Sequence, residues 1–164
     1  MRKLKAANSA SYVIVDAEFY ERFKELSLYV RHDGYVRVTI DGVREFLHRI
    51  ITKCPKGMTV DHINGNPLDN RRINLRICTA RENVRNSRKQ PGTVSKYKGV
   101  RFDRNGKRRK RWLAGIEESG KNTTIGRFHT EEEAALAYNK IAKERFGDFA
   151  KLNVVDPSPH ENTK

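Results

Sequence analysis

The chain has 164 residues, enough for one ordinary domain or two small ones with modest cores. Its net charge is +14, and this whole excess lies in residues 71–111, where 16 Lys and Arg residues stand against two acidic ones. Such a local excess predicts a polyanion-binding surface, although a solvated basic surface or a disordered basic linker has the same composition. No apolar run approaches the roughly 20 residues that span a bilayer, so we expect a soluble, intracellular protein.

Two cysteines, Cys54 and Cys78, are too few and too far apart for a Cys-x-x-Cys zinc site. We expect no signal peptide, and therefore reduced, buried thiols without structural zinc. The basic residues lack the amphipathic helical pattern of membrane-surface proteins, so no membrane partner is expected.

Residues 1–46 predict a small β-rich platform. Residues 1–10 are basic and polar and predict a frayed arm. Residues 12–15 predict a strand, after which Asp16 N-caps a short helix that runs to about Leu26. Three antiparallel strands follow, joined by Asp-Gly turns, over 28–30, 35–40 and 43–47. Arg37 and Arg44 belong to the wet face of this sheet, which faces either solvent or DNA; we favour solvent.

Residues 47–88 alternate short apolar runs with polar groups. A short helix is expected over 47–51, a strand over 58–60 that ends in Asp61-His62, and a return strand over 75–78. Thr79 and Glu82 form a capping box, which predicts a helix over about 80–88 with Asn83 in its first turn. The connecting loop is rich in Asn and Asp, and we assign Asn64, Asn66, Asp69 and Asn70 to its geometry.

These groups suit phosphodiester hydrolysis, which requires a base for water and a cation for the charge that builds on the phosphate. Asp61 and Asn83 offer hard oxygen ligands for magnesium or manganese, and His62 can act as a base near neutral pH. Neighbouring residues on a regular strand point to opposite sides, so Asp61 and His62 need an irregular backbone to meet. The alternative is that all three are turn, surface or satisfied loop residues.

The order Asp61-His62, Asn74-Leu75 and Asn83 closely resembles the HNH endonuclease ββα-metal motif, and residues 47–86 resemble its phage and intron-homing type. The resemblance implies that Asp61 and Asn83 hold one divalent metal, Mg²⁺ with Mn²⁺ as the alternative. It also implies that His62 is the general base, that Asn74 holds the loop which aims it, and that the host is a phage-infected bacterium. His48 is a further candidate for a residue that supports the site or contacts phosphate, although a histidine among apolar neighbours is more often a packed structural group. Five arginines are expected to bind phosphates: Arg71, Arg72, Arg76, Arg81 and Arg85.

Residues 89–95 read as a linker and 154–164 as a disordered tail, which leaves 96–153 as a further domain. Strands are predicted over 97–102, 111–116 and 122–128, followed by a helix that opens with the capping box of Thr130 and Glu133. Its apolar stripe, with Ala134 and Tyr138 among its members, should pack on the sheet.

The segments Tyr97-Lys98-Gly99-Val100-Arg101 and Trp112 to Ile116 resemble the plant ethylene-response-factor (Apetala-two) DNA-binding domain. That resemblance implies a sheet in the major groove, with Arg101 as a DNA contact. Gly115, Glu117 and Thr124 depart from the family pattern, so its target sequence does not carry over. Trp112 is either a DNA contact or a core aromatic, and Lys107, Arg108, Arg109 and Arg111 are either a phosphate clamp or a solvated hairpin tip.

The predicted fold is α+β: a small antiparallel N-terminal sheet, a ββα-metal HNH unit, then a three-stranded antiparallel sheet packed on one helix. The predicted function is a metal-dependent endonuclease on double-stranded DNA, without a small-molecule cofactor, whose C-terminal domain selects the site. The alternative is a DNA-binding transcriptional regulator with an inactive HNH module.

Overall fold

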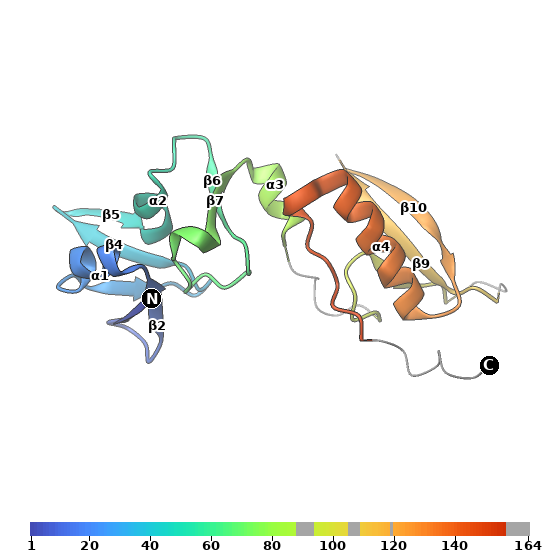
Figure 1. The fold of residues 1–164 in the computed structure, drawn as a ribbon, viewed down its shortest axis with the longest axis horizontal. Helices are drawn as coiled ribbons and strands as arrows, with labels where there is room; N and C mark the ends of the chain where they lie inside the picture. Colours follow the sequence, from blue (N-terminus) through green and yellow to red (C-terminus); the bar gives the residue numbers. More distant parts are fainter. Residues whose placement is uncertain (88–93, 105–108, 119, 157–164) are drawn as a thin grey trace. The chain divides into compact units, whose positions relative to one another are not determined.

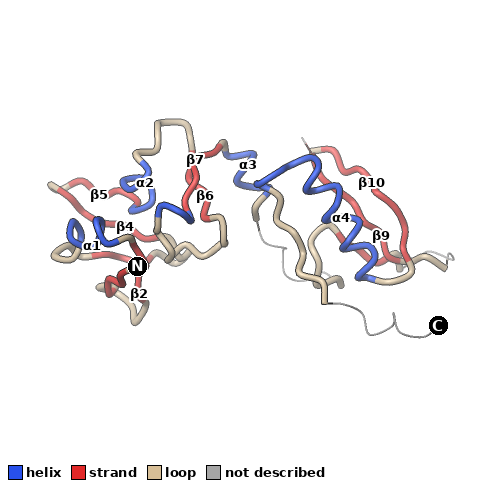
Figure 2. The backbone as a smooth tube through the Cα atoms, in the orientation of Figure 1, coloured by secondary structure: helices blue, strands red, loops and turns tan. Residues whose placement is uncertain are grey.

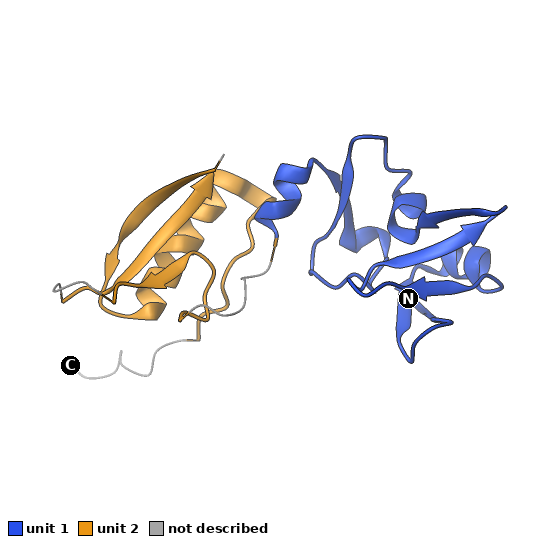
Figure 3. Ribbon diagram, turned by 180° about the vertical axis from the view of Figure 1, so that it is seen from behind, with its two compact units in different colours: residues 1–86 blue, residues 87–164 orange. Residues whose placement is uncertain are grey.

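The computed structural model describes residues 1–87, 94–104, 109–118 and 120–156. They divide into two compact units, 1–86 and 87–164, each with a hydrophobic core of its own (Figure 3). The predicted α+β class is confirmed, with short antiparallel sheets and few helices (Figure 2). None of the described helices is long and apolar enough to cross a membrane.

Unit 1 begins with a hairpin rather than the expected frayed arm. Strand β1 (Arg2–Lys5) pairs with β2 (Tyr12–Val15) along its full length. The arm prediction was wrong because Leu4 and Ala6 are buried, so that two apolar side chains in a basic segment suffice to dock it.

Helix α1 (Ala17–Phe23) begins after Asp16 as predicted, but it ends at Phe23 instead of about Leu26. The Asp16 side chain makes no capping hydrogen bond. Its Oδ2 instead accepts a hydrogen bond from the backbone N–H of Arg72 at 2.8 Å, so this carboxylate ties the N-terminal region to the loop before β7.

The strands β3 (Leu28–Val30), β4 (Val36–Ile40) and β5 (Val43–Phe46) form one antiparallel sheet, as predicted. Asp41 and Gly42 both have positive φ, at 50° and 77°, which is the backbone of a two-residue hairpin turn. One face of the sheet is buried through Val36 and Val38, and the other carries polar and aromatic side chains.

The second half of unit 1 contains α2 (Leu47–Thr52), β6 (Thr59–His62), a 3₁₀ turn η1 (Arg72–Asn74), β7 (Leu75–Cys78) and α3 (Ala80–Arg85). The capping box of Thr79 and Glu82 is present, but α3 ends at Arg85 rather than Arg88. Strands β6 and β7 are antiparallel, and α3 packs against both. The result is the predicted ββα unit. Of the two free thiols, Cys78 is buried as expected and Cys54 only partly, because it lies in the turn after α2.

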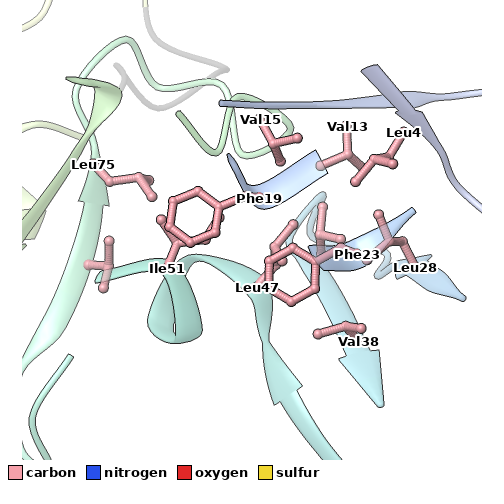
Figure 4. Packing of buried hydrophobic residues seen from close by; sticks show 12 residues of the cluster. Leu4, Val13, Val15, Phe19, Phe23, Leu28, Val38, Leu47, Ile51 and Leu75 are labelled. Atoms are coloured by element: carbon pink, nitrogen blue, oxygen red, sulfur yellow. The ribbon is translucent and has the colours of Figure 1, made fainter. Parts of the chain in front are cut away.

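A single hydrophobic cluster joins the N-terminal sheets to the ββα unit. Its buried members come from β1 to β4, α1, α2, β6 and β7: Leu4, Val13, Val15, Phe19, Phe23, Leu28, Val36, Val38, Leu47, Ile51, Val60 and Leu75 (Figure 4). Ile14 of β2 also donates its N–H to Leu68 O and accepts from Asn70 N–H, both at 2.8 Å. The N-terminal region therefore supports the loop between β6 and β7 directly.

Unit 2 is a three-stranded antiparallel sheet in the order β10 (Lys121–Phe128), β9 (Trp112–Glu118) and β8 (Val100–Phe102), with α4 (Glu131–Phe146) across one face (Figure 1). The capping box of Thr130 and Glu133 is confirmed, and Ala134 and Tyr138 pack on the sheet as predicted. A short 3₁₀ turn η2 (Gly147–Phe149) follows. The predicted linker residues 89–93 and tail residues 157–164 lie outside the described residues.

Gly99, directly before β8, lies close against α4 in unit 2. Its φ is +73°, and a Cβ there would lie 2.0 Å from the Tyr138 ring and 2.8 Å from Gly115 O. Only glycine combines this backbone conformation with so little space.

Candidate active site

Strand β6 carries both Asp61 and His62, and both side chains are buried. Asp61 pairs with Arg76 and His62 with Leu75 in a regular antiparallel register. The irregular backbone that we expected at the end of this strand is therefore absent at these two residues. Consecutive residues of a regular strand face opposite ways, and the two side chains indeed have different neighbours.

The Asp61 carboxylate is held by two side chains. Arg76 donates from Nε at 2.8 Å and from Nη2 at 2.5 Å to Oδ2. Asn86 Nδ2 lies 2.8 Å from Oδ1 and 3.0 Å from Oδ2. A carboxylate that is only 4% exposed is thus compensated by a cation and an amide.

Sequence reasoning missed Asn86 as a site residue. It is the C-cap of α3, and its amide also lies 3.2 Å from His62 O and 3.4 Å from Ile63 O. Asn86 therefore fixes both the Asp61 carboxylate and the backbone that follows it. The available signal was a second asparagine three residues after Asn83, at the end of the same short helix, a spacing that places the two on neighbouring parts of its surface.

His62 lies in an aromatic environment on the other side of the strand. The ring of Tyr35 is 5.7 Å from the imidazole and that of His48 is 5.3 Å away, measured between centroids. Nε2 of His62 is buried and has no hydrogen-bond partner among the described residues. Burial lowers the pKa of His62, while Asn70, Asp61 and Asp69 oppose that shift. The group is therefore a neutral imidazole at neutral pH, with a nitrogen available to accept a proton.

His48 is the nearest ring to His62 on the α2 side. It stacks on Phe46 at 5.2 Å, meets Tyr35 edge-on at 5.4 Å, and is 7% exposed. Burial, with smaller contributions from His62 and Arg49, lowers the pKa of His48 to about 3. This histidine is a neutral packing partner of His62 and is not placed to carry charge.

The loop between β6 and β7 is built from side-chain hydrogen bonds. Asn74 Oδ1 accepts from the Asn64 N–H at 3.0 Å, and Asn74 Nδ2 donates to Asp69 O at 2.7 Å. Asn64 Nδ2 donates to Asp69 Oδ2 at 3.0 Å, and Asn66 caps Leu68 N–H at 3.1 Å. The assignment of these residues to loop geometry is confirmed, with Asn74 spanning the loop.

Asn70 has an additional place in this loop. It is fully buried, with Nδ2 on Pro67 O at 3.0 Å, and its carboxamide acts on the His62 imidazole to raise its pKa. The sequence alone placed it among loop residues and contained no signal for this contact, because it depends on how the loop folds back on β6.

The arginines expected to bind phosphates differ in their surroundings. Arg71 forms an ion pair with Asp69 at 2.6 Å, and Arg76 with Asp61. Arg72 is bound to Glu18 at 3.1 Å and lies over the Phe19 ring. Arg81 is exposed and Arg85 half-buried on α3. Arg71, Arg72 and Arg76 therefore have a carboxylate partner inside the protein.

The donor set fits a divalent cation in chemical type. Asp61 presents a carboxylate at the end of β6, and Asn83 lies in the first half of α3, which packs against β6. Within the described residues there is no group of three or more His, Cys, Asp or Glu side chains that could hold a metal. A site here would thus rest on one carboxylate, one amide and water, which is usual for Mg²⁺.

In unit 2, Arg101 is exposed on β8, with Nη2 3.4 Å from Thr124 Oγ1. Trp112 packs on the hydrophobic cluster beneath α4 and lies 4.8 Å from the Phe102 ring, so the structure favours its core alternative. Arg111 stacks on Phe102 at 4.5 Å and donates to two backbone carbonyls. Arg109 is exposed, whereas Lys107 and Arg108 lie outside the described residues.

An uncharacterized HNH endonuclease of Acanthamoeba polyphaga mimivirus is 32% identical over 160 residues, which cover 93% of this chain and 80% of that protein. The chain belongs to the HNH endonuclease family. The model of the HNH endonuclease family matches residues 45–85, the segment from the end of β5 to the end of α3. Protein 3.8 of Escherichia phage T7 is 32% identical to this HNH endonuclease over 98 residues, or 60% of the chain and 78% of that protein.

The C-terminal region has a second set of relatives. Dehydration-responsive element-binding protein 2E of Oryza sativa is 45% identical over 60 residues, which cover 35% of this chain and 18% of that protein. Dehydration-responsive element-binding protein 2C of Arabidopsis thaliana is 41% identical over 63 residues, which cover 37% of this chain and 17% of that protein. The suspected combination of families is therefore confirmed. No solved structure shows a significant match.

Proposed function

We propose that this HNH endonuclease hydrolyses DNA phosphodiester bonds with a divalent metal, with His62 as general base and Asp61 and Asn83 as metal ligands. The observation that carries the proposal is the buried His62 imidazole, whose Nε2 has no partner among the described residues. A buried polar atom without a partner is costly, and a functional role for that atom explains why it is retained.

In this proposal the neutral imidazole accepts the proton of the attacking water. Burial lowers the pKa of His62, which keeps the imidazole neutral at neutral pH, so that one of its ring nitrogens can accept a proton. His48 and Tyr35 restrict the plane of the imidazole, and Asn74 holds the loop that follows it. When bound, the divalent cation would neutralise the charge that develops on the phosphate and on the leaving oxygen.

The residues around Asp61 have a positioning role in this proposal. Asn86 and Arg76 fix the orientation of its carboxylate and compensate its buried charge. We assign Arg71 and Arg76 to ion pairs with the buried carboxylates of Asp69 and Asp61, whereas the pair of Arg72 with Glu18 is exposed. Arg72, Arg81 and Arg85 remain the proposed phosphate contacts of unit 1.

Unit 2 is proposed to select the DNA site. Its support is the similarity to two dehydration-responsive element-binding proteins, together with the exposed Arg101 on the sheet. The proposed partner is double-stranded DNA, and Mg²⁺ is the metal we expect.

The test is nicking of supercoiled plasmid by the purified full chain in Mg²⁺ and in EDTA. His62→Ala should slow nicking by about 10²–10⁴-fold, the usual contribution of a general base. His32→Ala removes an exposed histidine of the same unit and should leave the rate unchanged. Plasmid that stays intact with the unmodified protein, or equal nicking by His62→Ala, would favour the DNA-binding regulator.

A further inference from the structure

The outer face of the sheet β3–β4–β5 combines arginine with aromatic side chains. Tyr29 lies opposite Arg37, and Arg37 opposite Phe46, while Thr39 lies opposite Arg44. Cross-strand partners and alternate residues share a face, so these five residues form one surface, which we call the Arg37–Arg44 face. None of the five is acidic. The opposite face carries Val36 and Val38 into the core.

The two arginines of the Arg37–Arg44 face contact rings and form no ion pair in the described part of the chain. The Arg37 guanidinium lies 4.5 Å from the centroid of Phe46, and that of Arg44 lies 5.7 Å from Tyr29. Arg37 Nε is buried and lacks a hydrogen-bond partner among the residues described. Arg31, which borders the face over the same Phe46 ring, is paired with Asp33. The positive charge of Arg37 and Arg44 is therefore uncompensated within unit 1.

The face leads to the proposed general base through a continuous series of rings. Phe46, whose ring contacts Arg37, stacks on His48 with ring centroids 5.2 Å apart, and the centroids of His48 and His62 are 5.3 Å apart. Tyr35 contacts all three of these rings. A polyanion that reaches His62 therefore extends naturally onto Arg37 and Arg44.

We propose that the Arg37–Arg44 face binds the phosphate backbone of the DNA duplex beside the bond that is cut. This inference rests on the proposed nuclease function. A duplex carries one charge per about 1.7 Å of its axis. A duplex with one phosphate at His62 therefore has further phosphates close by, and in this proposal Arg37 and Arg44 bind them. The rings restrict the guanidinium planes of Arg37 and Arg44, so that fixing them on a phosphate costs little further side-chain entropy.

This role corresponds to the DNA alternative for the face of Arg37 and Arg44, not to the solvent alternative that we favoured from the sequence. A solvated arginine gains little from a fixed position, whereas two arginines fixed over rings and without carboxylates form a preorganised anion site. In this proposal Phe46 connects the two sites, because its ring contacts the Arg37 guanidinium and also stacks on His48.

The experiment measures binding of the full chain to a duplex in EDTA, as a function of salt, by fluorescence anisotropy. Arg37→Gln with Arg44→Gln should weaken binding by roughly tenfold per arginine, as for loss of a charge-assisted hydrogen bond. The slope of log K against log salt should flatten by up to about 1.8. Arg44→Gln alone, at an exposed position, should give about half of that change.

The matched control is Arg2→Gln with Arg22→Gln. It also removes two arginines that lie over rings, 5.8 Å from Tyr20 and 5.3 Å from Phe23, but these two are exposed and lie on β1 and α1. Affinity and slope in the Arg37/Arg44 variant equal to those of this control would overturn the proposal. Competition by polyglutamate as strong as that by a duplex would also overturn it, in favour of an acidic protein partner.

Plasmid nicking separates the two levels of inference. If the unmodified protein nicks DNA and the Arg37/Arg44 variant binds normally, the surface is wrong and the nuclease stands. If no nicking occurs but the variant alone loses duplex binding, the surface stands and the proposed catalysis falls. If the unmodified protein binds no duplex, both are refuted.

Discussion

Replacing His48 with phenylalanine should make unit 1 more resistant to acid. His48 has its pKa lowered from 6.5 to about 3 by burial, so the folded state binds its proton far less readily than the unfolded chain. A lowered folded pKa contributes stability that is present above pH 6.5 and is lost as the pH falls toward 3. Phenylalanine keeps the stacking on Phe46 but does not titrate.

The magnitude follows from the size of the shift. Each pH unit below 6.5 removes up to about 1.4 kcal/mol from the free energy of unfolding, so at pH 4.5 the native protein has lost at most about 3 kcal/mol through His48. Lowered pKa values of Asp69 and Glu82 add to the acid loss, but they act equally in both proteins. The difference between the two pH profiles isolates His48.

Urea unfolding followed by far-UV circular dichroism at pH 8, 6, 5 and 4.5 measures this difference. Trp112 is the sole tryptophan and lies in unit 2, so its fluorescence follows the other unit in the same sample and should be unaffected. His32→Gln serves as the control, because that histidine is exposed. Parallel pH profiles for the native protein and His48→Phe would refute the reasoning that burial suppresses protonation of His48.

Three further results are expected. Gly99→Ala should destabilise unit 2 far more than Gly120→Ala, because both glycines have positive φ but, of these two, only Gly99 lacks space for a Cβ. The difference in the free energy of unfolding, measured by Trp112 fluorescence, should be at least about 1–3 kcal/mol. Asn86→Ala should destabilise unit 1 by about 1–3 kcal/mol, since it removes the amide from a buried carboxylate, whereas Asn83→Ala should mainly weaken Mn²⁺ binding, measured by electron paramagnetic resonance. Deleting residues 95–164 should broaden the choice of cleavage sites on random DNA more than it slows nicking, and an unchanged choice would contradict the role proposed for unit 2.

Local sequence patterns were sufficient wherever short-range physics decides the structure. Both capping boxes are present, because a Thr and a Glu three residues apart satisfy each other's backbone within one turn. The Asp41-Gly42 hairpin formed because these residues accept positive φ. The frayed arm was mispredicted for the opposite reason: Leu4 is buried by residues distant in the chain.

The candidate site shows the same division. The order of Asp61, His62, Asn74 and Asn83 is legible in the sequence, because one short ββα unit contains all four. Arg76 appeared as a phosphate contact because sequence shows its charge but not its partner across the β-ladder. Which acidic group an arginine meets depends on strand register, a long-range property.

By itself, the sequence determined the family, the α+β class and the groups available for chemistry, since these depend on residue types at fixed spacing. Only the tertiary structure decided that Asn86 secures Asp61, that His48 and Tyr35 enclose His62, and that Phe46 joins Arg37 to them. These contacts link residues that are far apart in the chain, and one shared hydrophobic core brings them together. The N-terminal sheet is thus part of the nuclease unit, because the packing that buries its apolar face also places its charged face beside the candidate base.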